Sequence, residues 1–190
     1  ASSGIGRGIA IALGREGVRL AIAARRRKLL EDTANEISKV GGYPPIIIEC
    51  DLYENEAARQ IADATLKDLS GVNILINNAG GSRSFDLDTT EEQWEEAYTL
   101  NFTRQRQITH ALLDNMINSN WGRIINFSSV LGLAARSGRA DYIASKTAIL
   151  GITRATAAET LELDGVTCNA ICPGSVLTPN TESKIGELAE

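Results

Sequence analysis

The chain alternates between segments with helical hydrophobic periodicity and short apolar runs. Ile5, Ile9 and Leu13 recur at helical spacing, which predicts a first helix ending near Gly14 and Gly17. The apolar run at 18–23 then predicts a buried strand. The same pattern predicts further helices over 28–40, 54–69, 91–118 and 140–163, and further strands over 44–49, 73–77, 123–127 and 166–171.

Strict strand–helix alternation with strands that are apolar throughout is typical of a parallel sheet covered by helices on both faces. We therefore expect an α/β protein with a doubly wound parallel sheet, the Rossmann fold, whose ligand lies at the carboxyl ends of the strands. Residues 1–190 fit a single domain. Both ends look truncated, and we expect a first strand and a C-terminal strand to be missing from the chain.

Composition narrows the classes of function. An apolar fraction of 43% is that of an ordinary globular protein, and a net charge of -5 argues against nucleic acid as a partner. No apolar run approaches the ~20 residues that a membrane helix needs, and no basic-then-apolar leader is present. We expect a cytoplasmic protein without a membrane partner.

The cysteines and the histidine do not predict a metal site. Cys50, Cys168 and Cys172 form no C-x-x-C pair, and His110 has no cysteine or histidine close to it in the sequence. Free buried thiols in a reducing compartment are the expected state of the cysteines. We predict that the protein binds no metal.

The glycine-rich opening, A-S-S-G-I-G-R-G at 1–8, precedes the first predicted helix. Glycines at this position let backbone N–H groups approach a pyrophosphate, and the helix dipole favours the negative charge. A tight turn without a ligand would show the same glycines.

Residues 25–28 read R-R-R-K and stand between a strand and a helix N-terminus, where cations oppose the helix dipole. One interpretation is a solvated basic turn. The other is an anion site, because an arginine at the end of this strand accommodates the 2′-phosphate of NADP, whereas an acid would hold the 2′-hydroxyl of NAD. The strand ends without an acid, which favours NADP(H) over NAD(H).

Polar residues follow the next two predicted strands. Asp51 could accept a hydrogen bond from an adenine amino group, or could cap a helix together with Glu54. The N-N-A-G turn at 77–80 lets the backbone pass close to a ligand.

Tyr142 and Lys146 lie at i and i+4 of a predicted helix and therefore share one face. A positive charge beside a phenol favours the phenolate, so Tyr142 could exchange a proton with a carbonyl or an alcohol near neutral pH. An ordinary surface pair of these residues would look the same in the sequence.

Taken together, these motifs resemble the short-chain dehydrogenase/reductase family, and most of all its 3-oxoacyl-[acyl-carrier-protein] reductase branch. The residues that carry the resemblance are A-S-S-G-I-G at 1–6, Asp51-Leu52, N-N-A-G at 77–80, Asn101, I-N-F-S-S at 125–129, Tyr142 to Lys146, and P-G-S-V-L-T at 173–178. They follow the family's order across nearly the whole chain.

The resemblance implies that the catalytic residues are Asn101, Ser129, Tyr142 and Lys146. Ser129 would bind the substrate oxygen, with Ser128 as the alternative, and Asn101 would form a helix kink that holds a relay water. The cofactor-binding residues implied are Ser2, Ser3, Gly4, Ile5, Gly6, Arg25, Arg26, Asp51, Leu52, Asn78, Ala79, Gly80, Tyr142, Lys146, Pro173, Gly174, Val176 and Thr178.

The activity expected from this resemblance is NADP(H)-dependent interconversion of a ketone and a secondary alcohol, with a 3-oxoacyl thioester as the first substrate to consider. Alternatives are an NAD-dependent sugar or hydroxy-acid dehydrogenase and a non-catalytic dinucleotide sensor. Arg136 and Arg139 either attract an acidic substrate or carrier protein, or are solvated loop charges. Family likeness also implies a homotetramer or homodimer through the helices predicted at 91–118 and 140–163.

Overall fold

The computed structural model describes residues 1–82, 89–163 and 165–178. The chain divides into two compact units, Ala1–Asp51 with Gly174–Glu190 and Leu52–Pro173, and each is described by itself. The single-domain organisation stays a prediction. The predicted C-terminal truncation concerns a segment that lies outside the described residues.

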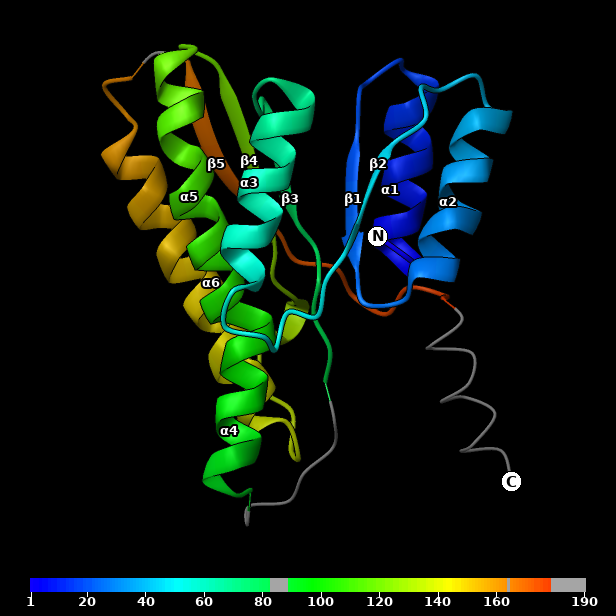
Figure 1. The fold of residues 1–190 in the computed structure, drawn as a ribbon. Coiled ribbons are helices and arrows are strands. Elements are labelled where there is room, and N and C mark those ends of the chain that lie inside the picture. Colours follow the sequence, from blue (N-terminus) through cyan, green and yellow to red (C-terminus); the bar gives the residue numbers. More distant parts are fainter. Residues whose placement is uncertain (83–88, 164, 179–190) are drawn as a thin grey trace. The chain divides into compact units, whose positions relative to one another are not determined.

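The first unit is built on a pair of parallel strands, β1 (Ala21–Ala24) and β2 (Ile46–Glu49). Figure 1 shows helices α1 (Gly4–Arg15) and α2 (Arg27–Lys39) side by side in this unit. The core that joins these elements consists of Ala10, Ile22, Leu30 and Ile37. All four residues are apolar and come from both helices and β1, so burial of the predicted apolar faces holds this unit together.

The second unit contains the parallel strands β3 (Ile74–Asn77), β4 (Gly122–Phe127) and β5 (Val166–Ile171), with β4 in the middle. Helix α3 (Ala57–Leu69) packs against α5 (Arg104–Asn118), and α6 (Ala140–Glu159) packs against β4 and β5. Every described ladder is parallel, as the alternation of strands and helices predicts. None of the helices in the described part of the chain is long and apolar enough to cross a membrane.

The helix predicted over 91–118 is present with these bounds, but it is not α-helical throughout. It consists of α4 (Glu91–Tyr98), a π-helical turn (Thr99–Thr103) and α5. A π-turn widens the helix by one residue and often marks a functional position. Asn101, where the sequence predicts a kink, lies within this π-helical turn.

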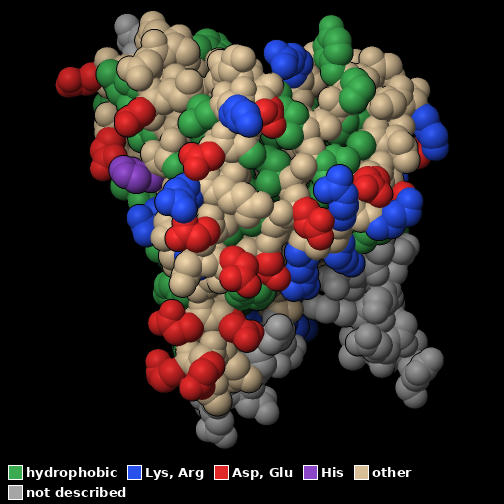
Figure 2. All heavy atoms as spheres, in the orientation of Figure 1, with side chains coloured by type: hydrophobic (Ala, Val, Ile, Leu, Met, Phe, Trp, Pro, Cys, Tyr) green, Lys and Arg blue, Asp and Glu red, His purple; other side chains and the backbone are tan. Residues whose placement is uncertain are grey.

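Helix α4 begins at a capping box in which Thr90 accepts from the Gln93 N–H and Gln93 binds back to the Thr90 N–H. Hydrogen bonds from its own backbone and from Thr90 lower the pKa of Glu92. The exposed acids of α4 form a cluster in the lower part of Figure 2; they are Glu91, Glu92, Glu95 and Glu96. Acids in the first turn stabilise the positive end of the helix dipole.

Some predicted boundaries differ from the observed ones. The strand predicted over 18–23 is β1, Ala21–Ala24, because only these residues pair with β2. The helix predicted over 140–163 ends at Glu159, and the strand predicted over 166–171 matches β5.

Candidate active site

Lys146 and Tyr142 share one face of α6. The Lys146 Nζ lies 5.8 Å from the centroid of the Tyr142 ring and donates to the Phe127 carbonyl at 2.8 Å. Lys146 is only 3% exposed, and this burial lowers its pKa to about 8. At pH 7 the amine still carries its proton, so a desolvated positive charge stands close to a half-buried tyrosine.

Asn101 joins the π-helical turn to the loop that follows β3. Its side chain donates to the Gly81 carbonyl and accepts from the Gly81 N–H, both at 3.0 Å, and also donates to the Ala97 carbonyl. The bond to the Ala97 carbonyl ties the π-helical turn to the end of α4. Asn101 is 1% exposed, so this arrangement is part of the packed interior.

Gly80 brings Asn101 and Lys146 together. A Cβ atom on Gly80 would lie 2.8 Å from Asn101 Oδ1 and 3.1 Å from Lys146 Nζ. No side chain fits there without displacing one of the two. The structure therefore places three of the predicted site residues around one point of the second unit.

The two candidate serines have different hydrogen bonds. Ser128 Oγ donates to the Lys146 carbonyl at 2.7 Å, so its proton is used to hold β4 to α6. Ser129 Oγ accepts from the Leu131 N–H at 3.1 Å, at the start of the 3-10 turn Val130–Gly132. Within the described residues the Ser129 hydroxyl proton has no acceptor, which favours Ser129 over Ser128 as the donor to a substrate.

The N-N-A-G turn is held by buried amides. Asn77 Nδ2 donates to Asn126 Oδ1 at 2.8 Å and to Thr109 Oγ1 at 2.9 Å, which ties β3 to β4 and α5. Gln105 Nε2 donates to the Ala79 carbonyl. Gln105 was not predicted from the sequence. The available signal was a second side-chain amide one helical turn after Asn101.

In the first unit, α1 begins at the glycine-rich turn. Gly4 has φ +53°, and a Cβ there would lie 3.3 Å from Thr178 Cγ2, so these two predicted cofactor residues are adjacent. Ser3 precedes the helix but makes no capping hydrogen bond with its side chain; its Oγ accepts instead from Arg26 Nη2 at 3.4 Å. The first N–H groups of α1 and the Arg26 guanidinium are donors of the kind that bind phosphate.

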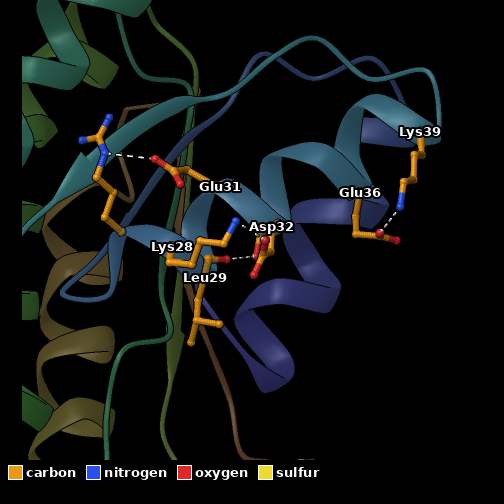
Figure 3. Close-up of polar contacts among 8 residues, drawn as sticks. Lys28, Leu29, Glu31, Asp32, Glu36 and Lys39 are labelled. Atoms are coloured by element: carbon orange, nitrogen blue, oxygen red, sulfur yellow. Dashed lines mark hydrogen bonds and ion pairs between the residues drawn. The ribbon is translucent and has the colours of Figure 1, made fainter.

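Two of the four cations in the basic turn at 25–28 form ion pairs. Arg27 contacts Glu31 at 3.1 Å and Lys28 contacts Asp32 at 3.3 Å, both along α2, and Figure 3 shows Lys28 reaching toward Asp32. Arg27 and Lys28, which are not among the predicted cofactor residues, therefore each have an acidic partner. In the part of the chain that is described, Arg25 and Arg26 have no carboxylate partner.

The structure also bears on predictions for Asp51 and for the two loop arginines. The interpretation of Asp51 as a helix cap is wrong, because α3 begins at Ala57 after Glu56. Arg139, at the start of α6, donates to Ser82 Oγ at 2.8 Å, whereas Arg136 is exposed. Among the described residues, no group of three or more His, Cys, Asp or Glu is placed to hold a metal ion.

Known proteins share both the sequence pattern and the fold. The family model for short chain dehydrogenase matches residues 1–188. The chain is 34% identical to the D-beta-hydroxybutyrate dehydrogenase of Cupriavidus necator, covering all of this chain and 73% of that protein. It is 32% identical to a 3-oxoacyl-[acyl-carrier-protein] reductase of Synechocystis, covering 96% of this chain and 74% of that protein.

Among solved structures, a proposed NAD(P)-dependent gluconate 5-dehydrogenase of Beutenbergia cavernae with bound NADP at low occupancy is similar to this chain. The TM-score is 0.91 at 31% identity, covering all of this chain and 75% of that one. The chain therefore belongs to the short-chain dehydrogenase family and has its α/β Rossmann fold. It is an oxidoreductase that acts on CH–OH groups with a nicotinamide dinucleotide.

Proposed function

We propose that this protein is an NADP(H)-dependent oxidoreductase that interconverts a ketone and a secondary alcohol, with a 3-oxoacyl thioester as the first substrate to test. The observation that carries the proposal is the buried Lys146 charge beside Tyr142, with Asn101 and Gly80 at the same point. Desolvation strengthens the interaction of such a charge with its neighbours. A site of this kind stabilises a change of charge on a phenol oxygen.

In this proposal Tyr142 gives a proton to the carbonyl oxygen during reduction and takes one from the hydroxyl during oxidation. Ser129 donates a hydrogen bond to the same oxygen, and Lys146 holds its charge beside Tyr142 and binds the nicotinamide ribose. Asn101 keeps the π-helical turn open for a relay water. The nicotinamide, when bound, supplies or accepts the hydride.

The remaining proposed cofactor contacts follow the family resemblance. The glycine turn of α1 binds the pyrophosphate, and the loop residues after β5 hold the carboxamide. The residues concerned are Ser2, Ser3, Gly4, Ile5, Gly6, Asp51, Leu52, Asn78, Ala79, Gly80, Pro173, Gly174, Val176 and Thr178.

The preference for NADP(H) rests on Arg25, Arg26 and Ser3 in the first unit. Arg26 contacts Ser3 next to the N-terminus of α1, and neither arginine has an acidic partner among the described residues. A 2′-phosphate would be bound by both guanidinium groups. Arg26→Ala should raise the Kd for NADPH about tenfold and leave that for NADH within twofold, since a hydrogen bond to a charged group contributes ~1.5–3 kcal/mol.

Lys28→Ala is the matched control, because Lys28 is a neighbouring cation that already pairs with Asp32. It should change neither Kd. Tighter binding of NADH than of NADPH by the wild type would contradict the proposed cofactor preference.

A second candidate is oxidation of a hydroxy acid with NAD. It is favoured by the relative at 34% identity, which is a D-beta-hydroxybutyrate dehydrogenase, and by Arg139, a cation in the first turn before Tyr142. A screen of 3-oxoacyl thioesters, 3-hydroxybutyrate and keto-sugars with both cofactors separates the candidates. Turnover of 3-hydroxybutyrate with NAD alone would favour the second.

Replacement of Tyr142 by Phe tests catalysis itself. The variant should lose turnover by more than a thousandfold, as expected for removal of a general acid, while it still binds the cofactor. A variant with full activity would remove Tyr142 from the mechanism. A wild type that binds the dinucleotide but turns over none of the substrates would favour the non-catalytic sensor.

A further inference from the structure

A buried arginine lies directly after the π-helical turn that carries Asn101. Arg104 is the first residue of α5 and is 6% exposed. It lies one helical turn before Ile108, on the face where Ile108 and Leu112 are buried. An arginine in an apolar series is costly to bury, so its partners have to be accounted for.

The guanidinium of Arg104 binds a segment without regular structure, residues 52–55, called here the 52–55 loop. Nε donates to the carbonyls of Leu52 and Glu54 at 3.0 and 3.1 Å. Nη2 donates to the Tyr53 carbonyl at 3.3 Å and to Asn55 Oδ1 at 3.0 Å. Three successive carbonyls of one loop are therefore bound by a single side chain.

One further partner lies on the helix itself, where Arg104 Nη1 donates to Gln107 Oε1 at 3.0 Å. Within the described residues no carboxylate pairs with Arg104. Its charge is compensated by carbonyl and amide dipoles, and its planar set of donors can serve several acceptors at once. The geometry is that of a loop clamp rather than an ion pair.

The same helical segment also binds the loop after β3. The Asn101 side chain donates to the Gly81 carbonyl and accepts from the Gly81 N–H, and Gln105 donates to the Ala79 carbonyl. Residues 101, 104 and 105 thus fasten two loops, 52–55 and 79–81. Both loops include residues that the proposed function assigns to the cofactor, Leu52 in one, and Ala79 and Gly80 in the other.

We propose, resting on that function, that Arg104 is a positioning residue for the adenosine half of the dinucleotide. It holds the backbone of the 52–55 loop in its binding conformation before the cofactor arrives. A preordered loop binds more tightly because its ordering entropy is lost on folding and not on binding. Without Arg104 the loop has to be ordered by the ligand, and affinity for the adenosine half falls.

The test uses three variants of the full chain, with folding checked by circular dichroism and thermal melting. Arg104→Met removes the clamp, and Asn55→Ala removes one acceptor from the loop side. Gln107→Ala is the matched control, because it removes one acceptor from the helix side and leaves the contacts to the loop in place. The probes are AMP and adenosine 2′,5′-bisphosphate, the adenosine halves of NAD and NADP, as competitive inhibitors.

We expect Arg104→Met to raise the Ki of the bound probe and the KM for the cofactor about tenfold, and to lower kcat by less than threefold. Asn55→Ala should raise Ki about threefold, and Gln107→Ala should not change it. Amide hydrogen exchange in the 52–55 loop of the free protein should accelerate in Arg104→Met. A purely structural role would lower the active fraction, and therefore kcat, without a change in Ki.

Three results would overturn the inference. Equal Ki values for wild type and Arg104→Met, with probe binding intact, would exclude the positioning role and leave the proposed function standing. A Gln107→Ala variant as impaired as Asn55→Ala would also exclude it. A wild type that binds neither probe would overturn the proposed function, and the positioning role with it.

Discussion

The burial of Lys146 predicts that its charge destabilises the folded protein at neutral pH. Lys146 has a pKa of about 8 in the folded protein against an ordinary value of 10.5. The unfolded chain therefore binds this proton more tightly than the folded protein does. The energetic cost is fully present below pH 8 and disappears as the pH rises from 8 to 10.5.

The magnitude follows from the two pKa values. The difference is 10.5 − 8, and each unit corresponds to about 1.4 kcal/mol, so the whole effect is about 3 kcal/mol. Most of it, about 2 kcal/mol, should appear between pH 7 and pH 10. This is a large part of the stability of an ordinary domain.

Lys146→Met removes the titrating group and keeps a long apolar side chain. The variant also leaves the Phe127 carbonyl without its donor, which costs about 1–3 kcal/mol at every pH. The absolute stabilities therefore do not test the idea, whereas the pH dependence does. The free energy of unfolding of wild type should rise by about 2 kcal/mol relative to Lys146→Met between pH 7 and pH 10.

The assay is urea unfolding of the cofactor-free protein at a series of pH values, followed by circular dichroism. Lys67→Met is the control, because Lys67 is exposed on α3 and its replacement should give a stability profile parallel to that of wild type. Parallel profiles for wild type and Lys146→Met would show that the ammonium of Lys146 is hydrated in the folded state. The electrostatic basis of the proposed site would then be refuted.

Three further predictions test other parts of the site. Gly80→Ala should lower kcat more than tenfold, because the new Cβ would crowd Asn101 Oδ1 and Lys146 Nζ. Gly151→Ala is the control and should keep its activity, because a Cβ at Gly151 would meet open space. Equal rates for the two variants would contradict the crowding at Gly80. Cys50 and Cys168 are buried, and burial raises the pKa of Cys168 to about 11, whereas Cys172 is partly exposed. An aromatic disulfide reagent at pH 8 should therefore find one fast thiol that disappears in Cys172→Ser, and persistence of that thiol would contradict the assignment. We expect light scattering to give the mass of a homotetramer or homodimer, as the family resemblance implies, and a monomer would contradict this.

Much of the site could be predicted because it is encoded locally. The i and i+4 positions of Tyr142 and Lys146 share a helix face whatever surrounds them, and the structure confirms their proximity. Asn101 was expected at a kink because asparagine is a poor helix former, and it lies in a π-helical turn. The resemblance already favoured Ser129 over Ser128, and the hydrogen bond from Ser128 to the Lys146 carbonyl supports that choice.

The basic turn agrees with the choice of Arg25 and Arg26 as the predicted cofactor residues. Four consecutive cations look alike in the sequence, yet Arg27 and Lys28 find acids one turn along α2, which leaves Arg25 and Arg26. These acids lie at the i+4 positions, so helical spacing alone separates Arg27 and Lys28 from the other two cations. The role of Arg104 could not be predicted in this way, because its acceptors are backbone carbonyls of a loop, and any residue type presents the same carbonyl.

The amino-acid sequence by itself determined the α/β class, the order of the elements and the residues of the family motifs, since hydrophobic period and short motifs are properties of neighbouring residues. Only the tertiary structure decided that Gly80 must leave room for Asn101 and Lys146, and that Arg104 clamps the 52–55 loop. Both features join segments that are distant along the chain. Packing brings such segments together, and no local pattern records which atoms will meet.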